Sequence, residues 1–274
     1  MWITLAFSLV FLSWKKNFAF LLLIVVLISA LFEGFITLYA IGILLVFFCI
    51  GIIHKYYNYK SILSILIEFL LFMGAIALFF HLITGFNNPK ILDKVLTGSQ
   101  SSLYSMYFNL DKSIVPFVLI LALPTLFYTK PIKHQTWWKW LILSLSIPIL
   151  LGIAVLLGGL KLEFALPSWI WQFILANLFF VSLAEETLFR GYIQKRLNDF
   201  IGSIPALLIT AVLFGLIHYH GGYLLIVFAT LAGLIYGIAW MWSGRIWIST
   251  FFHFGLNLIH LLFFTYPAYQ PHFQ

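Results

Sequence analysis

Long apolar stretches, each bounded by charged or turn-forming residues, run through almost the whole of this 274-residue chain. About 20 apolar residues in a helix cross the hydrocarbon core of a bilayer, so each stretch is a candidate membrane span. Hydrophobic residues make up 63% of the chain and charged residues 8%, whereas about 25% of a typical soluble domain is charged. The sequence therefore predicts an integral-membrane protein and excludes a soluble globular domain.

Ten segments are apolar enough to be membrane helices. They cover residues 2–14, 18–32, 35–53, 61–83, 113–128, 137–158, 169–197, 203–219, 223–243 and 246–264. The first two are short for full spans, so we expect eight to ten spans. Segment 2–14 has no positively charged start and no small-residue cleavage site, so we expect a membrane segment and not a signal peptide. The predicted fold class is all-α, a polytopic transmembrane helix bundle.

The basic residues divide unevenly when the ten segments alternate in direction. Four of the fifteen lie on one side, namely Lys90, Lys94, Lys112 and Lys161. The other eleven lie on the opposite side: Lys15, Lys16, Lys55, Lys60, Lys130, Lys133, Lys139, Arg190, Lys195, Arg196 and Arg245. The positive-inside rule makes the richer side cytoplasmic and predicts external termini. Segment 84–112 is then an external loop, long enough for a lid, a re-entrant element or a plain linker.

Several kinds of site are excluded by what the chain lacks. The chain has a net charge of +7, but it contains no basic run longer than Lys15-Lys16. This argues against nucleic acid as a binding partner and favours contact with anionic lipid. The single cysteine, Cys49, excludes an intramolecular disulfide and a cysteine-based metal site. We expect Asp93, Asp111 and Asp199 to lie in loops, which excludes an intramembrane aspartyl dyad. Neither Gly-x-Ser-x-Gly nor His-Glu-x-x-His occurs.

Ionisable residues inside the predicted spans are concentrated after residue 169. Glu186 and Arg190 are four residues apart and share a helix face, so we expect an ion pair. Glu185 points about 100 degrees away and is left without that partner. A charged group at membrane depth is costly and marks a candidate functional site. Four others are interpreted as ordinary polar contacts: Glu68, His81, His220 and His260.

His218 is expected to lie at the same membrane depth as Glu185. The midpoint between the two residues falls within 199–205, where Asp, Gly, Ser and Pro give a strong turn signal. Each residue is then roughly 25 Å of helix from the turn, at about 1.5 Å per residue. An antiparallel helix hairpin therefore brings this carboxylate and this imidazole together.

His253 and Asn257 are also four residues apart and share one face of the last span. His253 follows Arg245 by only about 12 Å of helix. A tilted helix, or an entry point deeper than Arg245, is needed to bring His253 to the depth of His218.

These side chains suit the hydrolysis of a peptide bond by water. Glu185 can act as general base and His218 can orient the same water. His253 and Asn257 can donate hydrogen bonds to the oxyanion of the tetrahedral intermediate. Glu185, His218 and His253 with water also match a catalytic zinc shell. Glu185 cannot be both a zinc ligand and the free base, so we prefer a mechanism without metal over one with a single Zn.

The three motifs resemble those of the CPBP family of intramembrane proteases, which groups CAAX prenyl endopeptidases with bacteriocin-processing and self-immunity proteins. Glu-Glu-x-x-x-Arg occurs at 185–190, Phe-x-x-x-His at 214–218, and the last motif, His-x-x-x-Asn or Asp, at 253–257. The resemblance covers about 169–265. It implies that Glu185 and His218 activate water and that His253 and Asn257 stabilise the oxyanion. Supporting roles in the site fall to Glu186, Arg190 and Phe214.

The resemblance also sets expectations for the whole chain. It implies a multi-pass endopeptidase, in a family commonly labelled metalloprotease, which acts on a membrane-associated protein or peptide. We expect the bacterial inner membrane as its location, the lipid bilayer as its surroundings, and no nucleic-acid partner. Residues 166–266 are the expected catalytic domain, after N-terminal membrane segments of unassigned role at 1–165 and before a short tail at 267–274.

Two other functions fit some of these features. Buried Glu and His side chains also form proton relays, as in a proton-coupled transporter. Such transporters tend to have paired halves with interrupted helices, whereas the ionisable residues here crowd into one third of the chain. A catalytically silent immunity or scaffold protein with the same fold is the second alternative, although every motif residue is intact.

Overall fold

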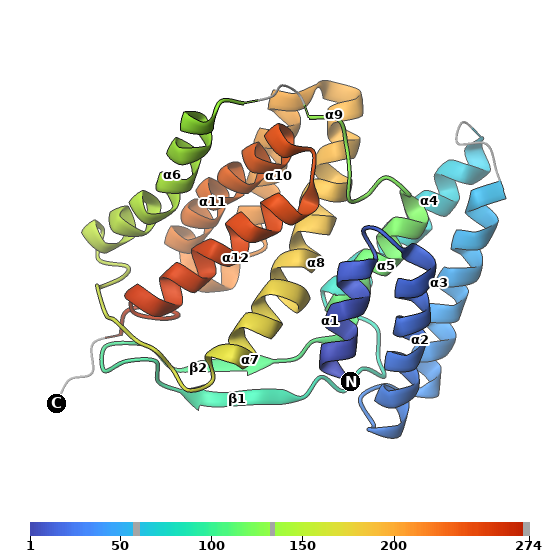
Figure 1. Cartoon of the computed structure of the whole chain (residues 1–274), viewed down its shortest axis with the longest axis horizontal. Coiled ribbons are helices and arrows are strands. Elements are labelled where there is room, and N and C mark those ends of the chain that lie inside the picture. The colour runs from blue at the N-terminus through green and yellow to red at the C-terminus, as the bar shows by residue number, and fades with distance from the viewer. Residues whose placement is uncertain (57–60, 132–134, 271–274) are drawn as a thin grey trace.

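The computed structural model describes residues 1–56, 61–131 and 135–270, which form a helical bundle with a small β-hairpin (Figure 1). The predicted all-α fold class is therefore confirmed. The first half contains α1 (Trp2–Phe11), α2 (Lys16–Phe32), α3 (Leu38–Tyr56), α4 (Ile62–Phe79), β1 (Lys90–Val95), β2 (Tyr104–Tyr107) and α5 (Leu110–Ala122). The second half contains α6 (Trp137–Leu156), α7 (Ile170–Leu175), η1 (Ala176–Ser182), α8 (Leu183–Glu186), η2 (Thr187–Gln194), α9 (Lys195–Ile201), α10 (Ser203–Leu216), η3 (Tyr219–Gly221), α11 (Gly222–Ser243) and α12 (Ile246–Phe263).

Six helical segments in the described part of the chain are long and apolar enough to cross a membrane. They are Leu38–Lys55, Ile62–Phe79, Trp137–Leu156, Ile170–Ile201, Tyr219–Ser243 and Ile246–Phe263. Three shorter helices, α1, α2 and α10, are also apolar, and the expected eight to ten spans depend on such short helices. Large apolar side chains such as Leu21, Ile65 and Ile149 are exposed on this surface, as lipid contact requires. The chain is a multi-pass integral membrane protein.

The segment with the paired glutamates is one long helix of mixed type. It runs through α7, η1, α8, η2 and α9, and both η1 and η2 have π-helical hydrogen bonding. Single π-helical turns are rare and often occur at functional sites. The four residues of α8, which include Glu185 and Glu186, lie between these two π-helical stretches.

Two glycines form the turns that join the last helices. Gly202 separates α9 from α10 with φ +81°, a backbone region that favours glycine, and confirms the turn predicted within 199–205. Gly244 ends α11 in the left-handed conformation, with φ +67°. A Cβ atom there would lie 2.1 Å from the Thr129 carbonyl oxygen. Only glycine fits at this turn.

The expected external loop 84–112 is partly wrong. Its centre forms an antiparallel hairpin of β1 and β2, which pairs Lys90 with Tyr107 and Val95 with Tyr104. Its last residues belong to the first turn of α5. Asp111 is therefore a buried helix residue and not a loop residue. The predicted span 113–128 also differs, because α5 already ends at Ala122.

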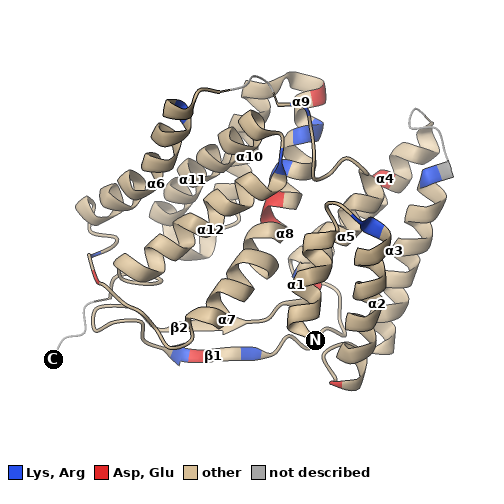
Figure 2. Cartoon of the chain, viewed as in Figure 1, with Lys and Arg blue, Asp and Glu red and all other residues tan. Residues whose placement is uncertain are grey.

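Charged residues are concentrated at the two ends of the bundle (Figure 2). Lys and Arg are found on α9 and on the first turn of α6 at one end, and on β1 at the other. The N-terminus lies at the β1 end (Figure 1), and Gln270 also contacts that end by donating its backbone N–H to Gln100 O, at 3.0 Å. Lys60, Lys133 and residues 271–274 lie outside the described residues.

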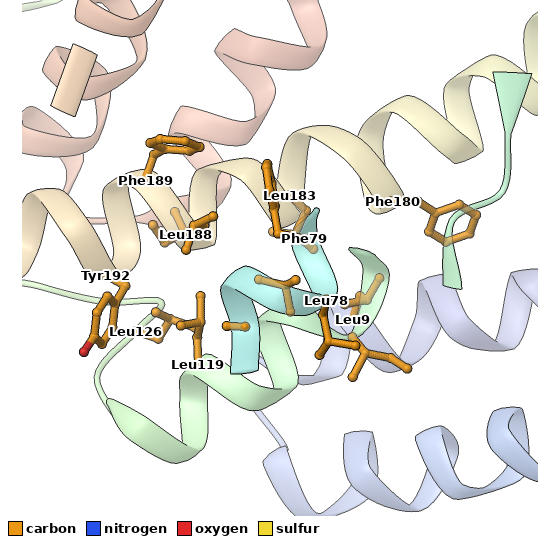
Figure 3. Close-up of a cluster of buried hydrophobic side chains, with 14 of the residues drawn as sticks. Leu9, Leu78, Phe79, Leu119, Leu126, Phe180, Leu183, Leu188, Phe189 and Tyr192 are labelled. Atoms are coloured by element: carbon orange, nitrogen blue, oxygen red, sulfur yellow. The ribbon is translucent and has the colours of Figure 1, made fainter. Parts of the chain in front are cut away.

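A buried apolar cluster fixes α5 against the long helix that carries the glutamates (Figure 3). It contains residues from α1, α4, α5, η1, α8 and η2, including Leu9, Leu78, Phe79, Leu119, Phe180, Leu183, Leu188 and Phe189. Each of these side chains is at most 4% exposed. Closely packed side chains leave little room for the helices to move relative to one another. The cluster therefore fixes the position of the N-terminal helices relative to the predicted site.

Candidate active site

The predicted ion pair between Glu186 and Arg190 is present. Arg190 Nη1 donates to Glu186 Oε1 at 2.8 Å, and both side chains are completely buried. Arg190 Nη2 donates to the Gly233 carbonyl oxygen at 2.9 Å, and the guanidinium carbon lies 4.6 Å from the centre of the Phe214 ring. The pair therefore joins η2 to α11 through a buried, charge-assisted contact.

The same glutamate positions His253. Glu186 Oε1 accepts a hydrogen bond from His253 Nδ1 at 2.9 Å, and Glu186 Oε2 accepts one from the Ser249 hydroxyl. The His253 ring also stacks on Tyr236, with centroids 4.6 Å apart and planes at 11°. The sequence analysis missed Ser249, although its spacing of four residues from His253 places both on one helix face. Glu186 thus orients the imidazole of the last motif.

Glu185 has a partner that the sequence analysis did not assign. Lys112 Nζ donates to Glu185 Oε1 at 2.7 Å, with side-chain exposures of 13% for Lys112 and 7% for Glu185. The expectation of an unpaired Glu185 is therefore wrong. It was wrong because Lys112 was assigned to the external loop, whereas packing places it on the first turn of α5.

The second carboxylate oxygen of Glu185 is free. Glu185 Oε2 is buried and has no hydrogen-bond partner among the residues that the structure describes. It lies 3.9 Å from His253 Nε2, beyond hydrogen-bond distance. Buried polar atoms are nearly always satisfied, so this gap fits a small polar group such as a water molecule or part of a substrate.

His218 and His253 pack against the same aromatic ring. The Phe214 centroid lies 5.0 Å from the His218 ring and 5.6 Å from the His253 ring. The common depth of Glu185 and His218 stays a prediction. His218 Nδ1 lies 2.8 Å from the Phe214 carbonyl oxygen. A carbonyl oxygen can only accept a hydrogen bond, so Nδ1–H is the donor. In neutral His218, Nε2 therefore keeps a lone pair that can accept a proton or orient water.

Asn257 is held by a second asparagine. Its Nδ2 donates to Asn177 Oδ1 at 3.1 Å, and the Ser182 hydroxyl donates to the same oxygen at 3.2 Å. Asn177 was missed by the sequence analysis, although an amide in a membrane span is itself a signal. Asn257 keeps a second N–H for another acceptor.

A cavity of about 460 Å³ opens beside these groups, between α6, α10, α11 and α12. His218, His253 and Asn257 form part of its wall, and Glu185 is not among the lining residues. Most of the remaining wall is apolar, including Leu150, Leu151, Ala154, Leu224, Leu225 and Phe228. The site therefore has a polar end and an apolar body, which is the usual composition of a ligand pocket.

Three of the four residues interpreted as ordinary polar contacts have such contacts, and the fourth, His220, has a ring contact. Glu68 accepts two hydrogen bonds from Arg196, at 2.6 and 2.7 Å. His81 Nδ1 contacts Asp111 at 2.7 Å, and His260 Nε2 lies 3.1 Å from the Thr265 carbonyl oxygen. The His220 ring packs on its neighbour Tyr219.

Glu185, His218 and His253 do not form a zinc site as they stand. Within residues 1–56, 61–131 and 135–270, no three His, Cys, Asp or Glu side chains are grouped closely enough to hold a metal ion. The Lys112 ammonium occupies one oxygen of Glu185, where a second cation would be repelled. These residues do not fit a zinc ion in this arrangement.

Comparison with known families gives one match. Residues 167–259 match the model of the family described as Type II CAAX prenyl endopeptidase Rce1-like. This segment contains all three motifs and leaves out Lys112 and the whole N-terminal half. Comparison with curated proteins and with solved structures gave no match. Over residues 167–259 the chain is similar to the type II CAAX prenyl endopeptidase Rce1-like family, which confirms the resemblance predicted from its motifs.

Proposed function

We propose that this protein is an intramembrane endopeptidase that hydrolyses a peptide bond of a membrane-associated protein or peptide. One observation carries the proposal: Glu185 Oε2 is buried, unpartnered within the described residues, and faces His253 Nε2 across 3.9 Å. A reacting group that lies beside this pair of atoms can contact both the carboxylate and the imidazole. The family match over 167–259 supports an endopeptidase in general.

The proposed reaction begins with a water molecule held between Glu185 and His218. Glu185 takes a proton from the water as the oxygen attacks the scissile carbonyl carbon, and the carbonyl oxygen becomes an oxyanion. The same proton then passes to the leaving amine as the C–N bond breaks. His218 can orient the water because its Nε2 lone pair is free when Nδ1 donates to Phe214.

The oxyanion is stabilised by His253 and Asn257. Glu186 accepts a hydrogen bond from His253 Nδ1, which orients the ring so that Nε2 points to the side of Glu185 Oε2. The remaining N–H of Asn257 supplies a second donor. Preorganised donors in a dry site contribute strongly, because they need no reorganisation during the reaction.

The division of the chain follows from these roles. Residues 166–266 are the proposed catalytic membrane domain, residues 1–165 form N-terminal membrane segments, and residues 267–274 form a short tail. The bacterial inner membrane is the proposed location, with external termini. An impermeant thiol reagent applied outside should label Asp93→Cys and not Lys130→Cys in a Cys49→Ser background. Labelling of residue 130 from outside would refute this orientation.

The function is tested with a defined probe in detergent micelles. The probe is an internally quenched peptide ending in a farnesylated Cys-aliphatic-aliphatic-X sequence, compared with the same peptide without the farnesyl group. The purified wild type should cut the peptide at one bond, identified by mass spectrometry, and His218→Ala should lose that activity. Binding of both peptides without any cleavage by the wild type would instead support a catalytically silent protein.

A further inference from the structure

Among the described residues of the N-terminal half, Lys112 is the one that forms an ion pair with Glu185. Its Nζ lies 2.7 Å from Glu185 Oε1, and both side chains are largely buried. Lys112 lies outside the matched segment 167–259 and outside all three motifs. Neither the motifs nor the family match therefore accounts for this contact.

The first turn of α5 is tightly held around Lys112. Asn88 Oδ1 accepts the backbone N–H of Leu110 at 2.8 Å, and Asn88 Nδ2 donates to Asp111 Oδ1 at 2.9 Å. Asp111 Oδ2 also contacts His81 Nδ1 at 2.7 Å. These hydrogen bonds fix the backbone next to Lys112, so the position of its Cα atom is well defined.

The path of the Lys112 side chain is also fixed. Its ammonium lies 4.5 Å from the centre of the Phe79 ring, a cation–π contact that favours a partly desolvated cation. Phe79 belongs to the buried cluster between α4, α5 and η2 (Figure 3). The same packing that joins the two halves of the chain thus directs Lys112 at Glu185.

A general base must be ionised before it can accept a proton. Burial disfavours a charged carboxylate, and an ammonium at hydrogen-bond distance favours it. The other charged or titratable groups that interact electrostatically with Glu185 are His218 on α10, His253 on α12, Arg190 on η2 and Tyr236 on α11, and Glu186 is its neighbour on α8. Arg190 pairs with Glu186, and among the described residues it is Lys112 whose basic side chain is in hydrogen-bond contact with Glu185.

We infer that Lys112 is a positioning residue for the reaction: it holds Glu185 ionised and aims the free Oε2 atom toward His253. The inference rests on the proposed function, because it assigns Glu185 the role of base. It also gives the N-terminal half of the chain a direct part in the site. The carboxylate has two oxygens, and Lys112 occupies one so that the other remains for the water.

The first test is the pH profile of kcat/KM for cleavage of the farnesylated probe. In Lys112→Met the acidic limb should move to higher pH by about 1 to 3 pH units, as expected when an opposite charge in contact is removed. The change should appear mainly in kcat and not in KM. Lys112→Arg keeps the charge and should retain the wild-type limb. Lys90→Met is the matched control, because Lys90 is an exposed residue of β1 that contacts Asp93 and the Tyr107 ring and lies outside the proposed site.

A second measurement separates this inference from the proposed function. Infrared spectra recorded across a pH series follow the C=O band of protonated Glu185. The band is assigned by its loss in Glu185→Gln. This measurement does not require that the protein cleaves a substrate. Protonation at higher pH in Lys112→Met than in Lys112→Arg supports the inference. If Lys112→Met does not fold, Lys112→Gln replaces it, and Lys112→Met/Glu185→Gln should recover folding. Equal protonation in the charged and neutral variants would overturn the inference.

Discussion

The Nε2 atom of His253 faces the free Oε2 atom of Glu185 across 3.9 Å, although the two residues are 68 positions apart in the sequence. Two neighbouring carboxylates have different tasks at this point. Glu186 holds His253 and Arg190 through direct hydrogen bonds, whereas Glu185 keeps one oxygen unpartnered within the described residues. In the proposed mechanism, the two adjacent positions on α8 therefore have different roles: Glu186 supports the site and Glu185 reacts.

Replacing Glu186 should destabilise the protein more than replacing Glu185. Glu186→Gln leaves Arg190 buried without its counter-charge, a loss of about 3 to 5 kcal/mol for a fully buried pair. Glu185→Gln leaves Lys112 without its partner, but Lys112 is 13% exposed whereas Arg190 is completely buried, so the loss should be smaller. Chemical unfolding in micelles measures both.

Glu33→Gln is the control for the change in side-chain chemistry alone, because Glu33 is exposed at the end of α2. It should have the stability of the wild type. Equal losses in Glu185→Gln and Glu186→Gln would contradict the division of roles between the two glutamates.

This division could be predicted only in part from the sequence. The Glu186–Arg190 pair and the turn at Gly202 depend on local spacing and backbone conformation, which the sequence specifies directly. Local rules therefore predicted the ion pair within one helix and the turn of the helix hairpin.

Contacts between distant helices were not predictable in this way. Lys112 reaches Glu185 because α5 begins earlier than its apolar run and packs against α8. Asn177 and Ser249 were missed because the prediction followed charged and titratable side chains, and these two side chains are uncharged. The hairpin of β1 and β2 was hidden in a segment that has no regular apolar alternation.

Removing an oxyanion donor should slow cleavage without weakening substrate binding. Asn257→Ala should lower kcat by about 100- to 1000-fold with little change in KM, as for other oxyanion donors. Asn177→Ala removes only the residue that orients Asn257, so its effect should be smaller. Steady-state kinetics with the farnesylated probe measures both, and a larger loss in Asn177→Ala would contradict the donor role of Asn257.

Metal removal should leave the activity unchanged. Chelators should not inhibit cleavage, because the Lys112 ammonium occupies one oxygen of Glu185, where a metal ion would be repelled. Metal analysis of the active protein, before and after dialysis against chelator, is the direct check. Stoichiometric zinc that is lost together with activity, and activity restored by zinc, would overturn the metal-free mechanism and leave the protease assignment standing.

Glu163 should make stability depend on pH below neutrality. Burial acts to raise the pKa of Glu163, but hydrogen bonds from Ser101, Gln100 and Ser99 outweigh it and lower that pKa below its usual value. Because the pKa of Glu163 is lowered in the folded state, its ionised side chain stabilises the fold. This stabilisation is complete above the pKa of the unfolded state and is lost as the pH falls through the pKa of the folded state.

Glu163→Gln should therefore be less stable than the wild type near neutral pH, with the difference disappearing in acid. Thermal unfolding of both proteins in micelles across this pH range measures the effect. Glu33→Gln serves again as the control at an exposed position. A difference that stays constant as the pH falls would show that the hydrogen bonds of Glu163 do not require its charge.

The most direct test of the account is the rate at which Glu185→Gln cleaves the farnesylated probe, measured beside the wild type and Glu33→Gln. The account predicts cleavage at one bond by the wild type and by Glu33→Gln, and no detectable cleavage by Glu185→Gln at a pH where circular dichroism shows the same helical fold in all three. Cleavage by Glu185→Gln at the wild-type rate would contradict the assignment of Glu185 as the general base.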